Sequence, residues 1–92
     1  MSTGDFMTNK LYHAKIEVRL KPGYMDPEGE TARKALLDLR YKVGRVGTAR
    51  IYEVDLQASS LEDAKKKTDE MCRKLLANPV KDDYTFEIKE MK

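Results

Sequence analysis

A short segment near the N-terminus, YHAKIEVRL at residues 12–20, constrains the fold more strongly than any other part of the chain. Its side chains alternate strictly between apolar and polar. The apolar set comprises Tyr12, Ala14, Ile16, Val18 and Leu20. A period of two is typical of a β-strand that buries one face and exposes the other. The pattern therefore predicts a sheet with a polar outer face, whose apolar face other elements must cover.

The following segment, KPGYMDPEGETARKALLDLR, predicts a turn and then a helix. Asp26 can accept hydrogen bonds from free N–H groups at the helix start, and Pro27 suits the first helical position because its missing N–H would have no partner there. The apolar stripe of this helix comprises Ala32, Ala35, Leu36 and Leu39. Gly29 costs helix stability, up to about 1 kcal/mol relative to alanine. We expect a glycine here to allow close approach by another backbone segment.

Residues 42–57 predict an extended segment with a break in its pattern. Tyr52, Val54 and Leu56 alternate cleanly with polar residues, whereas Ala49 and Ile51 stand on the opposite parity. One strand face cannot hold both sets without an extra residue, so we expect a bulge or bend near Ile51–Tyr52. The alternative is that both faces are covered here, one of them by a second subunit.

Ser59 and Ser60 are expected to open a second helix. Ser60 and Asp63 form a pair resembling a capping box. The apolar stripe comprises Leu61, Ala64, Thr68, Met71 and Leu75. The lysines at 65–67 belong to a solvated helix face, because acidic residues stand four positions before basic ones in Glu62–Lys66, Asp63–Lys67 and Glu70–Lys74.

This helix ends unusually, at Asn78-Pro79. Pro79 disfavours helical geometry at Asn78, and Asn78 tolerates the left-handed conformation that closes many helices. We expect both residues to shape the turn and not to contact a partner. A third strand follows, in which Tyr84, Phe86 and Ile88 alternate with polar residues.

The element order is therefore β-α-β-α-β, and the predicted fold class is α+β. We expect a two-layer sandwich of about three antiparallel strands, the second long and bulged, covered by two helices. A three-stranded sheet leaves two edges with unpaired backbone groups, so dimerisation is expected to extend the sheet. Residues 1–10 are expected to form a flexible N-terminal tail and residues 11–92 a single domain.

Composition argues against several classes of protein. The chain has 18 Lys and Arg against 16 Asp and Glu, a net charge of +2, which is too balanced for a nucleic-acid binder. It contains no apolar run of the roughly 20 residues that a membrane span needs, and its first ten residues lack the apolar core of a secretory signal. The single cysteine favours a reducing, cytoplasmic setting.

Candidate catalytic residues are few. His13 falls on the polar face of the first strand, where a surface role is expected because no other element identifies a positioned partner. Cys72 lies within the second helix and is expected to be a small buried hydrophobe. Asp82 and Asp83 precede the third strand and suit turn chemistry better than a metal site. Glycines 44 and 47 match no phosphate-binding loop. The sequence predicts no catalytic residue, no metal site and no cofactor bound by this chain.

Two segments together resemble a known family. DPEG at residues 26–29 and MCRKLLANPV at 71–80, followed by Tyr84, resemble the PurS family, the small subunit of phosphoribosylformylglycinamidine synthase. The resemblance covers residues 12–90. One segment departs from it: the family commonly carries a VRxGK-like stretch in its second strand, whereas ARIYEV keeps Arg50 but has Tyr52 and Glu53 where Gly-Lys stands.

The resemblance implies a subunit without catalytic groups of its own, within an ATP-dependent glutamine amidotransferase complex of de novo purine biosynthesis. Its partners would be a glutaminase, PurQ, and a synthetase, PurL, between which it would assist ammonia transfer. ATP, Mg²⁺ and glutamine would be used by these partners, and this chain would form a dimer or a dimer of dimers. The residues that carry the family motifs, and that the resemblance makes candidates for an interface, are Asp26, Pro27, Gly29, Arg50, Asn78 and Pro79.

Two other functions deserve comparison. A regulatory α+β domain that senses a small molecule would share this element order, and binding of an amino acid or nucleotide would stabilise the isolated chain against heat. An acyl-phosphate hydrolase would need an arginine in the loop after the first strand, and KPGYMDPEG has none.

Overall fold

A computed structural model describes residues 9–91 of the chain. The expected N-terminal tail lies outside this range except for Asn9 and Lys10, and Lys10 already belongs to the first strand. The elements are β1 (Lys10–Leu20), α2 (Pro27–Asp38), β2 (Ala49–Ala58), α3 (Leu61–Met71), the π-helical turn η1 (Cys72–Leu76) and β3 (Asp82–Glu90). This order confirms the predicted β-α-β-α-β arrangement and the α+β class.

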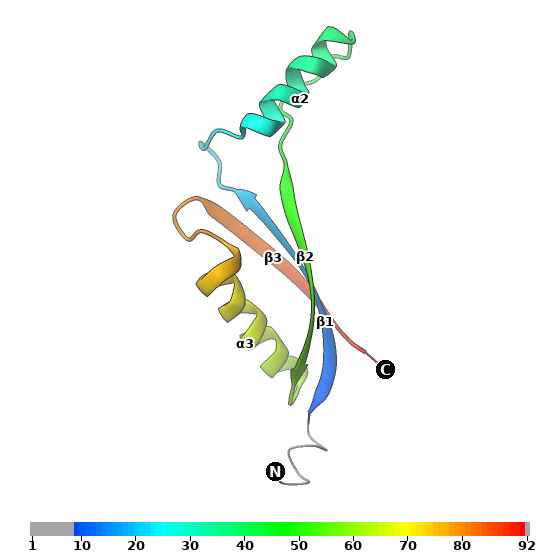
Figure 1. Cartoon of the computed structure of the whole chain (residues 1–92), viewed down its shortest axis with the longest axis vertical. Coiled ribbons are helices and arrows are strands. Elements are labelled where there is room, and N and C mark those ends of the chain that lie inside the picture. The colour runs from blue at the N-terminus through cyan, green and yellow to red at the C-terminus, as the bar shows by residue number, and fades with distance from the viewer. Residues whose placement is uncertain (1–8, 92) are drawn as a thin grey trace.

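The three strands form one antiparallel sheet in the order β2-β1-β3. The strictly alternating strand β1 is central, so both of its edges are hydrogen-bonded, while β2 and β3 form the two edges of the sheet. Its apolar residues Tyr12, Ala14, Ile16 and Val18 are all buried. They face α3, which lies along one face of the sheet (Figure 1).

The expected bulge in β2 is not present. Pairing with β1 runs unbroken from Arg19 opposite Ala49, through Ile16 opposite Tyr52, to Lys10 opposite Ala58. Tyr52 therefore shares the α3 side with Ile16, and Ile51 projects from the other face, where 49% of its surface is exposed. The mixed parity thus reflects apolar side chains on both faces, because a regular strand alternates its side chains between faces.

Helix α3 covers the sheet through small residues. Ala64, Thr68 and Cys72 are fully buried, and the Thr68 hydroxyl donates to the Ala64 carbonyl (2.8 Å). The expected stripe differs at its end, because Leu75 is 83% exposed. The π turn explains this difference: Ala77 N–H donates to the Cys72 carbonyl (2.9 Å), and the wider turn rotates Leu75 away from the sheet.

The polar side of α3 is largely as expected. Asp63 N–H donates to the Ser60 hydroxyl (3.1 Å), while the reciprocal bond to the Asp63 carboxylate comes from the backbone of Ser59 (2.9 Å). The three lysines at 65–67 are exposed. Of the three predicted ion pairs, Asp63–Lys67 forms (3.1 Å).

Helix α2 does not lie on the sheet of its own chain. It extends beyond the end of β1 and β2, away from α3, and makes the molecule elongated, with extents of 62 × 28 × 16 Å (Figure 1). Its expected apolar stripe is open: Leu39 is 67% exposed, and Gly29 is the only buried residue of the helix. Within one chain the helical layer therefore consists of α3 and η1, which differs from the expected pair of helices over the sheet.

Candidate functional site

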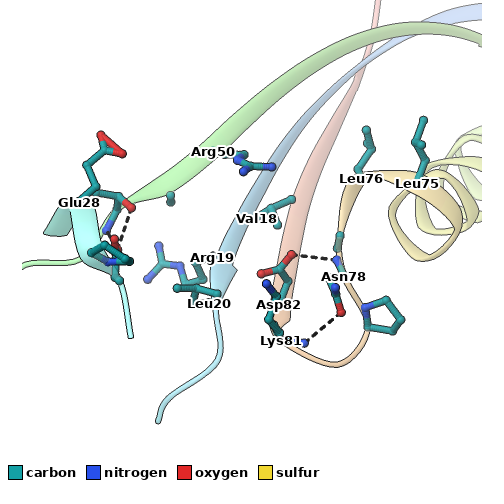
Figure 2. A pocket seen from close by; sticks show the side chains of 16 residues that line it. Val18, Arg19, Leu20, Glu28, Arg50, Leu75, Leu76, Asn78, Lys81 and Asp82 are labelled. Atoms are coloured by element: carbon teal, nitrogen blue, oxygen red, sulfur yellow. Dashed lines mark hydrogen bonds between the residues drawn. The ribbon is translucent and has the colours of Figure 1, made fainter. Parts of the chain in front are cut away.

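Three segments that are distant in the sequence meet where the sheet ends and α2 begins. They enclose a hollow of about 810 Å³ on the α3 side of the sheet. Figure 2 shows Val18 and Arg50 between the start of α2 and the turn that carries Asn78 and Asp82. Of the six family-motif residues, the five that line the hollow are Asp26, Pro27, Arg50, Asn78 and Pro79. The sixth, Gly29, does not line the hollow and lies in the first turn of α2.

Asp26 connects α2 to the start of β2. One carboxylate oxygen accepts from Gly29 N–H (2.9 Å), as expected of a helix cap, and the other accepts from both the backbone N–H and the hydroxyl of Thr48 (2.7 Å each). These hydrogen bonds, that from Gly29 first, hold the pKa of Asp26 below its ordinary value. The sequence indicated the cap but gave no signal for Thr48, because that contact spans the loop between α2 and β2.

Gly29 is required by a close backbone contact. A Cβ atom at this position would lie 2.3 Å from the carbonyl oxygen of Val46 and 3.1 Å from the Asp26 carboxylate. The segment before β2 thus passes directly against the first turn of α2, which confirms the expected approach of another backbone. Together with Asp26 and Thr48, this contact sets the direction in which α2 leaves the sheet.

Asn78 shapes the turn between η1 and β3. Its side-chain oxygen accepts from the backbone N–H groups of Val80 (2.8 Å) and Lys81 (3.3 Å), while its own N–H donates to the Asp82 carboxylate (2.8 Å). The interpretation of Asp82 as a turn residue is therefore confirmed. The expected left-handed conformation of Asn78 is wrong: among residues 9–91 the only non-glycine residue with positive φ is Arg40. The π turn ends the helix instead.

Arg50 and the apolar residues near it are exposed. Arg50 lines the hollow at the start of β2, and it belongs to none of the ion pairs found within residues 9–91. Beside it, Leu75 projects into solvent, and 68% of the surface of Val80 is exposed. A cation without a salt bridge, bordered by exposed aliphatic side chains, is typical of a protein-binding surface.

His13 has partners that the sequence did not reveal. Nδ1 lies 2.6 Å from the Asp55 carboxylate and Nε2 lies 3.2 Å from that of Glu53, because the antiparallel register places these β2 residues beside it. The Asp55 hydrogen bond contributes most to raising the pKa of His13 above its ordinary value. The cluster lies on the sheet face opposite α3.

Cys72 is fully buried between α3 and the sheet, as predicted. Burial raises the pKa of its thiol, which favours the unreactive protonated form. His13 and Cys72 are on opposite sides of the sheet, so the structure does not bring a thiol and an imidazole together. Within residues 9–91, no group of three or more His, Cys, Asp or Glu side chains is placed to hold a metal ion. None of the helices described is long and apolar enough to cross a membrane.

Comparisons with known proteins agree on one family. The family model PurS, phosphoribosylformylglycinamidine (FGAM) synthase, matches residues 13–90. The chain is 45% identical over 74 residues to the phosphoribosylformylglycinamidine synthase subunit PurS of Archaeoglobus fulgidus, covering 79% of this chain and 92% of that subunit.

Two solved structures resemble the fold closely. Thermus thermophilus PurS superimposes with a TM-score of 0.79 at 35% identity, covering 89% of this chain and 99% of that one. A chain of the Thermotoga maritima PurLQS structure superimposes with a TM-score of 0.75 at 27% identity, covering 88% of this chain and 98% of that one.

Proposed function

The chain belongs to the PurS family, a subunit of phosphoribosylformylglycinamidine (FGAM) synthase in purine biosynthesis, and we propose that it holds the glutaminase PurQ against the synthetase PurL. In this role it assists the transfer of ammonia from one partner to the other. It acts as a dimer or a dimer of dimers in the cytoplasm.

One observation carries this proposal: five of the six family-motif residues, from three separate segments, line a single open hollow. Asp26 and Asn78 form hydrogen bonds that shape its walls, whereas the Arg50 side chain is exposed within it. Residues that hold a surface in one shape, around an exposed arginine, suit the docking of another protein. The similarity to a chain of the Thermotoga maritima PurLQS structure supports PurL and PurQ as the docked proteins.

The catalytic work in this proposal belongs to the partners. ATP, Mg²⁺ and glutamine bind to PurL and PurQ, and this chain supplies neither a nucleophile nor a general base. Its buried thiol lies across the sheet from its imidazole, which supports a structural role. The chain contributes by keeping two active sites in a fixed relation, so that ammonia released in one reaches the other before it escapes to water.

The test is reconstitution of the synthase from purified PurL, PurQ and this chain. We expect turnover with glutamine to need all three proteins, while turnover with ammonium ion needs only PurL. If glutamine-dependent turnover is the same without this chain, the proposal is refuted. Measuring both nitrogen sources separates loss of assembly from loss of synthetase activity.

Arg50→Ala examines the hollow itself. Arg50 forms no ion pair among the described residues, so its removal should leave the fold intact. Truncating a central interface arginine commonly costs about 2 kcal/mol, roughly a 30-fold loss of affinity for the partner. Lys66→Ala, on the exposed face of α3, removes the same charge outside the hollow and is the matched control. Each variant is titrated into a mixture of PurL and PurQ, and the midpoint of the rise in glutamine-dependent turnover is compared. Equal midpoints for the two variants would show that the hollow is not part of the interface.

A further inference from the structure

The loop between α2 and β2 concentrates the positive charge of the chain. Residues 39–52 contain four of the 18 Lys and Arg and no Asp or Glu. The four cations are Arg40, Lys42, Arg45 and Arg50, and we call residues 40–50 the basic loop. The rest of the chain carries 14 basic and 16 acidic residues, a net charge of −2, so the charge is segregated although the total is only +2.

All four of these side chains are exposed. Nine ion pairs form within residues 9–91, and none of them uses a cation of the basic loop. Exposed cations that are gathered at one place, with no carboxylate of their own chain paired to them, attract an acidic surface and steer its approach.

The structure holds part of the basic loop in place. The loop runs back along α2 to the start of β2 (Figure 1), where Val46 passes against Gly29 and Thr48 donates to Asp26. The side chain of Arg45 lies over Gly47, since a Cβ atom at residue 47 would be 2.6 Å from a guanidinium nitrogen of Arg45. A charged loop that is already positioned loses less entropy on binding than a mobile one.

Arg40 occupies a backbone position that favours glycine. Its φ is 75°, in the left-handed region, and it directly follows Leu39, the C-cap of α2. The N–H of Tyr41 donates to the Leu36 carbonyl (3.0 Å), a bond found at many helix ends that a left-handed glycine closes. Arginine is disfavoured there because of its Cβ atom. A charged residue in a position where glycine fits better indicates a role outside folding.

We propose that the basic loop binds an acidic surface, rich in Asp and Glu, on one of the proteins with which the chain assembles. The inference rests on the proposed function, since PurL and PurQ are the proteins that would carry this surface. Arg50 belongs both to the loop and to the lining of the hollow, so the acidic surface continues the contact made in the hollow. Arginine is also among the residues that contribute most to protein interfaces.

A second copy of this chain has few carboxylates to offer to the loop. Each of the nine ion pairs uses a different carboxylate, and Asp26 and Asp82 accept hydrogen bonds from backbone N–H groups. Most of the 16 Asp and Glu are therefore already engaged. A nucleic acid fits less well than an acidic protein, because Asp38 and Glu53 border the loop and repel phosphates.

Arg40→Gly combined with Lys42→Gln tests the proposal. Glycine adopts the backbone conformation of residue 40 without strain, so this loop variant should melt no lower than the wild type. Titrated into PurL and PurQ at about 0.05 M salt, it should need roughly tenfold more protein for half-maximal glutamine-dependent turnover, because two exposed charge pairs are lost. At about 0.5 M salt the difference from the wild type should shrink to less than about twofold, since salt screens exposed charges.

The matched control is Lys66→Gln combined with Lys89→Gln, which removes two exposed lysines outside the loop that form no ion pair within residues 9–91. A loop variant that titrates like this control at low salt would overturn the proposal. Light scattering that finds the loop variant less associated than the wild type would also overturn it, because the loop would then bind a second copy. Binding of poly(U) RNA by the wild type that the loop variant loses would assign the loop to nucleic acid instead. Failure of the proposed function looks different, because glutamine-dependent turnover would then not depend on the wild-type chain at all.

Discussion

Replacing Gly29 by alanine measures how tightly helix α2 is held against the segment that precedes β2. The new Cβ atom would lie 2.3 Å from the Val46 carbonyl oxygen, and reaching ordinary contact at 3.4 Å requires a retreat of about 1 Å. The opposing atom belongs to backbone, so no rotamer change relieves the clash. Overpacking of this kind costs about 1–3 kcal/mol, while alanine improves helix propensity by at most about 1 kcal/mol. We expect net destabilisation of about 1–2 kcal/mol.

The loss should be visible in two assays. Thermal unfolding followed by circular dichroism should shift down by about 4–8 °C per kcal/mol for a domain of this size. Amide hydrogen exchange should accelerate at Thr48, whose N–H donates to Asp26 only while the segment lies against the helix. Gly44→Ala is the control, since a Cβ there meets nothing within 4 Å. Unchanged melting and unchanged exchange at Thr48 in Gly29→Ala would refute the reasoning.

Three further outcomes follow from the hydrogen bonds of the structure. Because the pKa of Asp26 is lowered, the contribution of its carboxylate to folding stability is complete above the ordinary value of 3.8 and is lost as pH falls through the lowered pKa. Acid should therefore speed hydrogen exchange at Thr48, and Asp26→Asn should abolish that pH response. Because the pKa of His13 is raised, the contribution of its imidazolium to folding stability is complete below 6.5 and is lost as pH rises through the raised pKa. An NMR titration of the imidazole should give a midpoint above 6.5, and Asp55→Asn should lower that midpoint. Asn78→Gly removes the side-chain oxygen that accepts hydrogen bonds from two N–H groups of the turn, so it should lower the melting temperature while the dimer persists. If the variant stays folded and dimeric but no longer supports glutamine-dependent synthesis, Asn78 contacts a partner instead.

Local patterns predicted the elements, the end of β1 and the start of α2. The period of two in β1 and the Asp26-Pro27 start of α2 depend on neighbours within a few residues, and both appear as predicted. Gly29 was informative for the same reason: a glycine in a helix needs a compensating contact, and the structure supplies one. The bulge near Ile51 was predicted on the assumption that every apolar residue of β2 faces one core, and the unbroken register shows apolar residues on both faces.

The candidate site was predictable as a set of residues but not as a place. The family motifs identified Asp26, Arg50 and Asn78, and the fold brings them to one hollow because β1 ends where β2 begins and η1 returns to the same end of the sheet. Nothing in the sequence indicates Thr48 and Val46, since their contacts with α2 cross a loop and have no local spacing signal. The carboxylates around His13 are likewise not predictable from local sequence, because they come from a different strand.

The sequence by itself determined which segments are strands and helices, which face of β1 is buried, and which family the chain resembles. Those properties depend on side-chain period and on capping residues, which are local. Only the tertiary structure decided where α2 goes. An apolar stripe specifies that a helix must pack but not where it lies. The direction in which α2 leaves the sheet is imposed by contacts of Asp26, Gly29 and Thr48 that cross the loop before β2.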